Sequence, residues 1–351
     1  MTVVSKTIAA GPPYTHHREF QEENSVKTRQ FLAGVAGVAL AAVALVAGPA
    51  QAQGYPNRPV RVIVTFPPGG TPDIYGRIMS NELSKLWNQS VVVENRTGAA
   101  GGIGSDFVAK SAPDGYTLLF AADASITVTP NLVQNLPYDP VRDFAPIVNV
   151  AQGPFVLMVH SSVPANNMKE LIAWIRSQPG KISYASSGNG SQQHLSMELI
   201  RTSAGVDMVH IPYKGFGQGL VDVLAGQVPM LFGGATAAIG IIRSGKLRGL
   251  GVTSKTRVKA LPEVPPIADT IPGMDILAWY GFLAPAATPR EIIRKINADS
   301  ITIIRRPEFQ ERLVKDGIEP VANTPEEFAA QIKGDLATWA KVVKASGAKL
   351  D

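Results

Sequence analysis

Short runs of β-branched residues alternate with amphipathic segments along most of this chain, a pattern typical of α/β proteins. The first such unit is well marked. Residues 61–66 (RVIVTF) place apolar side chains on both faces of an extended chain, which predicts a strand covered on both sides. Ile74, Ile78 and Leu83 then fall on one face of a helix. Two prolines and two glycines at 67–70 predict a tight strand-to-helix turn between them.

The same alternation continues to the end of the chain. Further strands are predicted at 90–94, 116–121, 155–159, 182–185, 208–211, 230–232, 247–252 and 277–284. Further helices are predicted at 105–111, 167–178, 192–204, 218–225, 237–244, 289–305, 308–316 and 325–344. Residues 123–146 are punctuated by proline and are expected to form a loop. The first three strands and their helices make a βαβαβ unit, which predicts a parallel core.

An export signal is predicted near the start of the chain. Lys27 and Arg29 precede an apolar run at 31–47, and residues 50–52 (AQA) match a small-x-small cleavage pattern. The run is short and is followed at once by the cleavage pattern, which disfavours a retained membrane anchor. Residues 1–52 are therefore expected to be removed, and the protein is expected to work in the periplasm.

The remaining length suits two domains of ordinary size, because 351 minus 52 leaves 299 residues. We expect the chain to cross between domains near residue 153 and to return after a proline-rich connector at 261–273. Domain 1 is then 53–152 plus 276–351, and domain 2 is 153–275.

Charge and composition exclude several classes of protein. Removal of the leader takes away four Lys or Arg and three Glu, which leaves 29 basic and 25 acidic residues, a net charge of +4. The basic residues are dispersed, so nucleic acid is not expected as a partner. The chain has no cysteine, which excludes disulfides, thiol catalysis and thiolate metal sites. His160, His194 and His210 lack the spacing of a metal site, so no metal is expected.

Two glycine turns are candidate anion sites. In the first, residues 67–73 (PPGGTPD), we expect Thr71 as N-cap and Pro72 as the first helical residue. The second, residues 184–194 (YASSGNGSQQH), again joins a strand to a helix, with Ser191 as the expected N-cap. Free N–H groups at a helix start attract anions, and adjacent glycines let a ligand approach the backbone. Each turn alone is weak evidence, because many βα connections are glycine-rich and bind nothing. Together with the export signal, they predict a binding protein that closes on a small acid.

Enzymatic interpretations find less support in the sequence. Ser191 and His194 lie within one helical turn, but no G-x-S-x-G motif exposes the serine. The glycines at 98–104 do not match the G-x-G-x-x-G dinucleotide motif. No cofactor is therefore expected.

Several long sequence blocks carry a resemblance to a known family. They are YPNRPVRVIVTFPPGGTPD, VVVENRTGAAGGIGSDFVAKSAPDGYTLL, NLPYDPVRDFAPI, YASSGNGSQQHL, HIPYKG and LAGQVPMLF. In this order they resemble the Bug family, the periplasmic solute receptors of tripartite tricarboxylate transporters, over essentially the whole mature chain. The resemblance implies a two-domain Venus-flytrap fold of type II with a hinge and an interdomain cleft. It also implies a ligand carboxylate held by backbone N–H groups and ordered water.

The family pattern, carried over residue by residue, implies a set of ligand-binding positions. These are Pro68, Gly69, Gly70, Thr71 and Asp73 in the first turn, Ser125 after the third strand, Ser187, Asn189, Gly190, Ser191 and His194 in the second turn, and Tyr213, Lys214 and Gly215. One departure stands out. Many members carry Asp after the Phe of the QVxxxF stretch, whereas Phe232 here is followed by Gly233 and Gly234. The missing acid disfavours a ligand amino group at this place and is expected to leave extra room.

Three of these side chains have competing interpretations. Asp73 is expected to complement the helix dipole or to support the turn rather than to face a bound carboxylate, which it would repel. His194 either donates to the ligand or bonds only local backbone. Lys214 is either a counter-ion for a second carboxylate or a solvated surface lysine.

These observations predict a receptor without catalytic activity. Its expected ligand is a di- or tricarboxylate or an aromatic carboxylate, and its expected partners are the membrane subunits of a tripartite tricarboxylate transporter. The receptor is expected to be a monomer. The alternatives are a secreted hydrolase or lyase acting on a carboxylate ester, and a periplasmic sensor subunit.

Overall fold

The computed structural model describes residue 2 and residues 54–348. Apart from residue 2, the predicted export signal lies outside the described residues. The chain from residue 54 onward forms one compact unit, which is described here by itself. None of its described helices is both long enough and apolar enough to cross a membrane.

One mixed sheet runs through this unit, and we divide it into two strand groups. The strands of the first group are β1 (Val60–Val64), β2 (Val91–Asn95), β3 (Thr117–Ala122), β9 (Leu277–Pro285), β10 (Glu319–Pro320) and the first part of β4 (Phe144–Val159). Those of the second are β5 (Ser183–Ser186), β6 (Val209–Pro212), β7 (Met230–Gly234), β8 (Arg248–Val252) and the end of β4. Strand β1 pairs in parallel with β2 and β3, which confirms the predicted parallel core.

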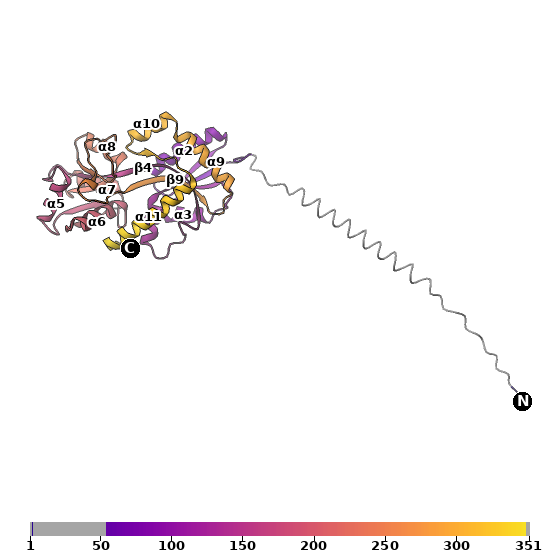
Figure 1. The fold of residues 1–351 in the computed structure, drawn as a ribbon, viewed down its shortest axis with the longest axis horizontal. Helices are drawn as coiled ribbons and strands as arrows, with labels where there is room; N and C mark the ends of the chain where they lie inside the picture. The colour runs from indigo at the N-terminus through magenta and orange to yellow at the C-terminus, as the bar shows by residue number, and fades with distance from the viewer. Residues whose placement is uncertain (1, 3–53, 349–351) are drawn as a thin grey trace. The chain divides into compact units, whose positions relative to one another are not determined.

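Strand β4 joins the two groups. It pairs with β9 as far as Pro154 and with β7 from Phe155 onward, so its partner changes between these two residues. The change lies next to the predicted crossing near residue 153, although the domain limits themselves stay a prediction. Figure 1 shows β4 and β9 running between the helices that flank the two strand groups.

The predicted loop at 123–146 and the predicted strand at 155–159 are wrong in extent. The structure has a π-helical turn η2 (Ala124–Val128) and a short helix α4 (Thr129–Leu132), and β4 already begins at Phe144. Proline in a strand removes a hydrogen-bond donor and usually argues against the strand. Here Pro146 lies at a register shift between β4 and β9, so the irregular ladder accommodates it.

Helices cover both faces of the sheet. The first group carries α2 (Thr71–Trp87), η1 (Ala99–Gly101), α3 (Gly102–Ala109), α9 (Arg290–Ile304), α10 (Pro307–Lys315) and α11 (Pro325–Ser346). The second carries α5 (Met168–Arg176), α6 (Gln192–Ala204), α7 (Phe216–Leu224), α8 (Ala235–Arg243) and the short η3 (Ile267–Asp269). On β1, Val62 and Val64 belong to the core that includes Tyr75 of α2, whereas Ile63 packs with Trp279 and Phe328 on the opposite face.

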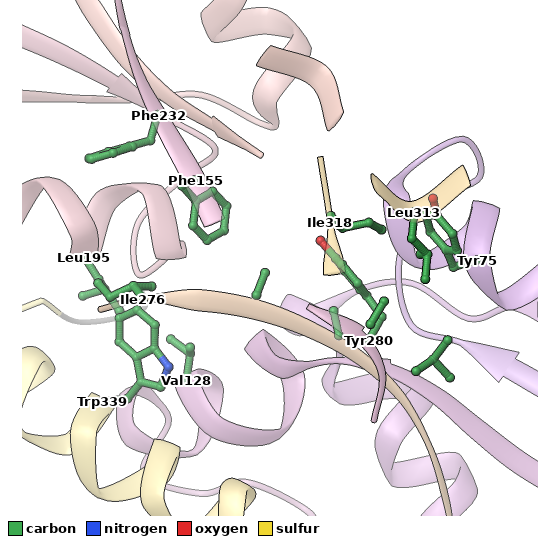
Figure 2. Packing of buried hydrophobic residues seen from close by; sticks show 14 of the residues in the cluster. Tyr75, Val128, Phe155, Leu195, Phe232, Ile276, Tyr280, Leu313, Ile318 and Trp339 are labelled. Carbon is green, nitrogen blue, oxygen red and sulfur yellow. The ribbon is translucent and has the colours of Figure 1, made fainter. Parts of the chain in front are cut away.

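The two strand groups also meet through side chains from helices. Trp339 of α11 packs near Leu195 of α6, and Val128 of η2 lies in the same cluster (Figure 2). These contacts place the start of α6 beside the carboxyl end of β3. Burial of large apolar side chains at such a contact is its main stabilising term.

Candidate functional site

Loop 1, residues 67–73, follows the carboxyl end of β1 and leads into α2. Gly70 is the N-cap, so the helix begins one residue earlier than predicted, with Thr71 as its first residue and Pro72 as its second. Gly69 has a φ of +84°, a left-handed conformation that glycine adopts without strain. All four residues from Pro67 to Gly70 are exposed, which leaves this backbone open to a ligand.

The buried carboxylate of Asp73 stabilises loop 1. One carboxylate oxygen accepts from Gly69 N–H at 3.0 Å, and the other accepts from Asn95 Nδ2 at 2.8 Å and forms an ion pair with Arg77 Nε at 2.9 Å. Burial alone would raise the pKa of Asp73, but the bonds from Arg77, Gly69 and Asn95 together lower it. The carboxylate is therefore occupied by the protein, in agreement with a supporting role rather than ligand contact.

Loop 1 leaves backbone donors at the start of α2. Pro72 has no N–H, and no acceptor among the described residues is bonded to the N–H of Thr71 or of Asp73. Unpaired N–H groups in the first turn carry the positive end of the helix dipole. The described geometry thus offers two donors to an anion at this point.

Loop 2, residues 184–194, follows β5 and leads into α6. Ser191 is the N-cap, as predicted, and its hydroxyl accepts from His194 N–H at 3.3 Å. Gly190 N–H donates to His194 Nδ1 at 3.0 Å, and Gly188 N–H donates to Ser186 Oγ at 3.1 Å. The loop therefore uses several of its own donors to hold its shape.

The described N–H groups without an acceptor follow directly after Ser191, at the start of α6. No acceptor among residues 54–348 is bonded to the N–H of Gln192 or of Gln193, the first two residues of α6. These two groups, rather than Gly190 N–H, are the ones open to an anion. Of the other predicted ligand positions in this loop, Ser187 and Asn189 are half-buried.

Two histidines support loop 2. The rings of His194 and His210 stack with centroids 3.9 Å apart and planes 5° apart, and the ring of Tyr184 stacks on His210 at 5.0 Å. Ser186 Oγ lies 2.6 Å from His210 Nε2. Burial lowers the pKa of His194, and burial together with the neighbouring His194 lowers the pKa of His210 to about 4.

Some polar groups of the predicted ligand positions after β6 are already bonded within the protein. The Tyr213 hydroxyl donates to Asp222 Oδ2 at 2.6 Å, and Tyr213 N–H donates to Ser186 O at 3.1 Å beside loop 2. Lys214 has an exposed side chain, while its N–H donates to Gln218 Oε1 at 3.1 Å. Gly215 is the N-cap of α7 with a φ of +145°. These bonds fix the turn without revealing a counter-ion role for Lys214.

Ser125, the predicted ligand position after β3, is buried in the described structure. Its side chain is fully buried, and its hydroxyl donates to Ala122 O at 3.0 Å. A Cβ placed on Gly101 would come within 2.6 Å of Ser125 Cβ, so the glycine permits close packing over the serine. The segment that contains Gly101 therefore packs directly against the Ser125 side chain.

A contact between the strand groups went unpredicted. Gln192 Nε2, at the start of α6, donates to Asp123 Oδ2 at the end of β3, and both residues are buried. Burial raises the pKa of Asp123, and the nearby Asp335 raises it further. The carboxyl end of a strand is where ligand groups gather in α/β proteins, so the position of Asp123 was the available signal.

The expected extra room at Gly233 is not found. A Cβ on Gly233 would come within 2.7 Å of Met158 Cε and 2.8 Å of Phe216 Cε2. The space that an acidic side chain would need is filled by an aromatic ring and a methyl group. The expectation failed because the sequence does not show that Phe216 folds over the strand end.

One cavity of about 420 Å³ lies elsewhere, across the middle of β4. Its walls come from Gln152–Pro154 of β4, from residues 254–259 and from the segment 317–320 that includes β10. None of the predicted ligand positions lines it. We place the candidate site at loops 1 and 2 nevertheless, because unpaired helix-start donors are found there.

Residues 75–348 match the family described as tripartite tricarboxylate transporter family receptor. The chain belongs to this family, within the Bug group of solute receptors. It is 37% identical over 323 residues to protein BugT of Bordetella pertussis, covering 91% of this chain and 98% of BugT.

Solved structures agree with this assignment. A Rhodopseudomonas palustris protein, Rpa4515 with adipate, superposes with a TM-score of 0.78 at 33% identity, covering 84% of this chain and 99% of that one. MatC from the same organism, with bound malate, gives a TM-score of 0.73 at 28% identity, covering 82% and 100%. This Bug-family chain therefore has the mixed α/β fold of periplasmic solute-binding proteins, and its fold class was predicted correctly from the sequence.

Proposed function

We propose that this Bug-family protein is a periplasmic receptor that binds a small carboxylate between loops 1 and 2. The observation that carries the proposal is the pair of helix starts, α2 and α6, each following a glycine turn at the carboxyl end of a parallel strand. Each offers two N–H groups without an acceptor among the described residues. The adipate and malate named with two relatives support a carboxylate as the ligand class.

Binding in this scheme depends on preformed donors. Asp73 fixes loop 1 and His194 fixes loop 2 before a ligand arrives, so little ordering is left for the binding step. A carboxylate that takes N–H groups from both helix starts favours the arrangement in which they approach each other. The domain limits 53–152 plus 276–351 and 153–275 belong to this proposal, with β4 and β9 as hinge segments.

Location and partners complete the proposed function. The predicted export signal and the family support a periplasmic receptor that hands its ligand to the membrane subunits of a tripartite tricarboxylate transporter. A sensor subunit would share the same site, so this rival makes the same binding predictions. Dependence of cellular uptake on the protein and the membrane subunits together would favour the transporter role.

Catalysis finds little support at the site. Ser186 and His210 form a serine–histidine pair, but the Ser186 hydroxyl is buried and also bonded to Gly188. His210 has a pKa of about 4, which makes it a weak base at neutral pH. His194 Nδ1 faces Gly190 N–H rather than the Ser191 hydroxyl. We therefore assign no enzymatic role.

A thermal-shift panel tests the proposal. Adipate, malate, citrate, terephthalate and aspartate would each be added to the purified protein, and ligand at 100 times its Kd should add ~2.7 kcal/mol of stability. The Gly70→Asp variant should lose the shift, because the new carboxylate blocks and repels the anion. Its Cβ has only ordinary contacts at 3.6 and 3.7 Å, so the variant is expected to fold.

Gly334→Asp is the matched control, because Gly334 lies exposed on α11 with nothing within 4 Å of its Cβ position. It should keep the full ligand-induced shift. Stabilisation that survives in Gly70→Asp, or no stabilisation by any acid of the panel, would contradict the proposed site.

A further inference from the structure

Each of the two central glycines of loop 2 is tied to a histidine. Gly190 N–H donates to His194 Nδ1, and Gly188 N–H donates to Ser186 Oγ, which in turn contacts His210 Nε2. The two imidazole rings stack almost face to face. The conformation of loop 2 is thus linked by hydrogen bonds to two stacked rings, those of His194 in α6 and His210 in β6.

The bond at Gly190 restricts the protonation of His194. A nitrogen that accepts from a backbone N–H carries no proton, so His194 must be neutral with its proton on Nε2. Protonation of Nδ1 would set two donors against each other over 3.0 Å. The Gly190 bond and the charged form of His194 therefore exclude one another.

The stack adds a second restriction. Two imidazolium rings with centroids 3.9 Å apart repel strongly, so a charge on one ring disfavours a charge on the other. His194 is buried and His210 is partly buried, which disfavours charge on either ring. His210 also contacts Ser186, so a change in its position reaches Gly188 as well.

We propose that His194 and His210 form a pH-dependent support for loop 2, which keeps its ligand-binding conformation only while His194 is neutral. His210 is a positioning residue in this scheme, because it acts through His194 and Ser186. The inference concerns the loop itself, and its consequence for affinity rests on the proposed function.

Among residues 54–348, two charged side chains act on the pKa of His194. Glu198 and Arg201, further along α6, act on His194 in opposite directions, the former raising and the latter lowering its pKa. Arg201 Nε pairs with Glu198 at 2.8 Å, and the Tyr184 hydroxyl donates to the same carboxylate at 2.7 Å. The ring of Tyr184 of β5 lies 5.0 Å from the ring of His210 and 6.4 Å from that of His194. The Glu198 carboxylate is thus held by Tyr184 and Arg201, and its charge partly offsets the lowering of the His194 pKa by burial.

The expected pH dependence follows from the direction of the shifts. Both histidines bind protons less readily in the folded chain than at their ordinary pKa of 6.5. The contribution of the two neutral histidines to the stability of the folded chain is complete above pH 6.5 and is lost as the pH falls through their folded pKa values. Loop 2 should therefore be ordered at neutral pH and released in acid.

Nuclear magnetic resonance on the ligand-free protein tests this directly. Imidazole ¹⁵N spectra should show His194 as the Nε2–H tautomer at pH 7.5, with a titration below pH 6.5. The protection factor of the Gly190 amide, which corrects for intrinsic exchange, should fall at least about tenfold as His194 gains its proton, the equivalent of one lost hydrogen bond.

Three variants distinguish the Gly190–His194 hydrogen bond from the contact that links Gly188 to His210 through Ser186. His194→Phe should remove protection at Gly190, because it removes the acceptor. His210→Phe keeps a stacked ring and the Ser186 acceptor, so it should only reduce protection at Gly188 and should spare Gly190. His160→Gln is the matched control, because His160 bonds Ser162 away from loop 2 and should leave both amides unchanged. Adipate affinity, measured between pH 5 and 8, should fall together with Gly190 protection.

The inference is overturned if His194 is the Nδ1–H tautomer, if it titrates at or above pH 6.5, or if Gly190 stays protected when His194 is charged. These readouts need no ligand. Failure of adipate and the other acids to bind would therefore count against the proposed function alone, while loss of the spectroscopic coupling would count against the histidine support alone.

Discussion

Gln192 and Asp123 form a buried hydrogen bond that joins the start of α6 to the end of β3. The two residues belong to different strand groups, and Gln192 lies on the same helix as Leu195, whose packing near Trp339 of α11 is shown in Figure 2. A contact of this kind holds the two groups in the arrangement described. Its strength should therefore affect both stability and ligand affinity.

Loss of the Gln192 side chain should weaken the receptor. In Gln192→Ala the buried Asp123 loses the Gln192 side-chain donor, a change that typically costs about 1–3 kcal/mol. We expect a lower melting temperature and a carboxylate affinity reduced by about tenfold, measured by calorimetry. Gln134→Ala, at an exposed position, is the control and should change neither. Unchanged affinity in Gln192→Ala would show that the contact does not contribute to binding.

Asp73 should contribute more to the stability of the folded chain than its ion-pair partner Arg77. Asp73→Ala removes the acceptor of Gly69 N–H and Asn95 Nδ2 and should destabilise the protein by about 1–3 kcal/mol, with loss of ligand binding. Arg77→Ala removes only a half-exposed partner and should cost less than about 1 kcal/mol. Urea denaturation at pH 7 measures both. Equal costs for the two variants would contradict the bracing role of Asp73.

The pH dependence of Asp73 has a defined sign. Its pKa is lowered in the folded chain, so its stabilising contribution is present above the ordinary value of 3.8 and is lost as the pH falls through the folded pKa. Asp73→Asn should therefore flatten the loss of stability below about pH 4, as seen in acid unfolding curves. A curve identical to that of the unmodified protein would exclude the predicted shift.

Asp335 should destabilise the folded chain at neutral pH. Burial raises its pKa to about 6, while Trp279 Nε1 donates to its carboxylate at 2.9 Å. A raised pKa means that stability falls as the pH rises from about 4 to about 6. Asp335→Asn keeps an acceptor for Trp279 and should add on the order of 2 kcal/mol at pH 7. No gain, or a loss, in chemical denaturation would contradict this prediction.

A methyl group at Gly233 should be poorly tolerated. Gly233→Ala places its Cβ against Met158 and the Phe216 ring, an overpacking that typically costs about 1–3 kcal/mol. The double variant Gly233→Ala with Phe216→Leu should recover part of this loss. Gly240→Ala, in the open surface of α8, should be neutral or slightly stabilising. Additive costs in the double variant would show that Phe216 does not fill the space.

The sequence predicted the regular elements well where periodicity and caps agreed. Helix α6 lies at the predicted residues 192–204 with Ser191 as its N-cap, because the glycine turn and the cap both mark its start. Strand β4 was predicted too short, because proline and glycine within it indicate a break that the register shifts instead absorb. Local pattern cannot show which ladder irregularities a neighbouring strand will accept.

The sequence predicted the backbone of the candidate site, its two glycine turns, better than it predicted the contacts of the side chains. Both glycine turns are where the sequence placed them, since helix starts depend on local residues. The contacts of Asp123, Gln192 and His210 depend on partners far along the chain, which no local pattern reveals. For the same reason the sequence left the roles of His194 and Lys214 open.

The most direct test of the account is a calorimetric titration of the purified protein with the acid that gives the largest thermal shift. The unmodified protein and Gly334→Asp should bind one equivalent with the same affinity and no continuing heat from turnover, and Gly70→Asp should show no binding. Equal affinity in all three proteins, or heat that continues after saturation, would contradict a carboxylate receptor with its site at loop 1.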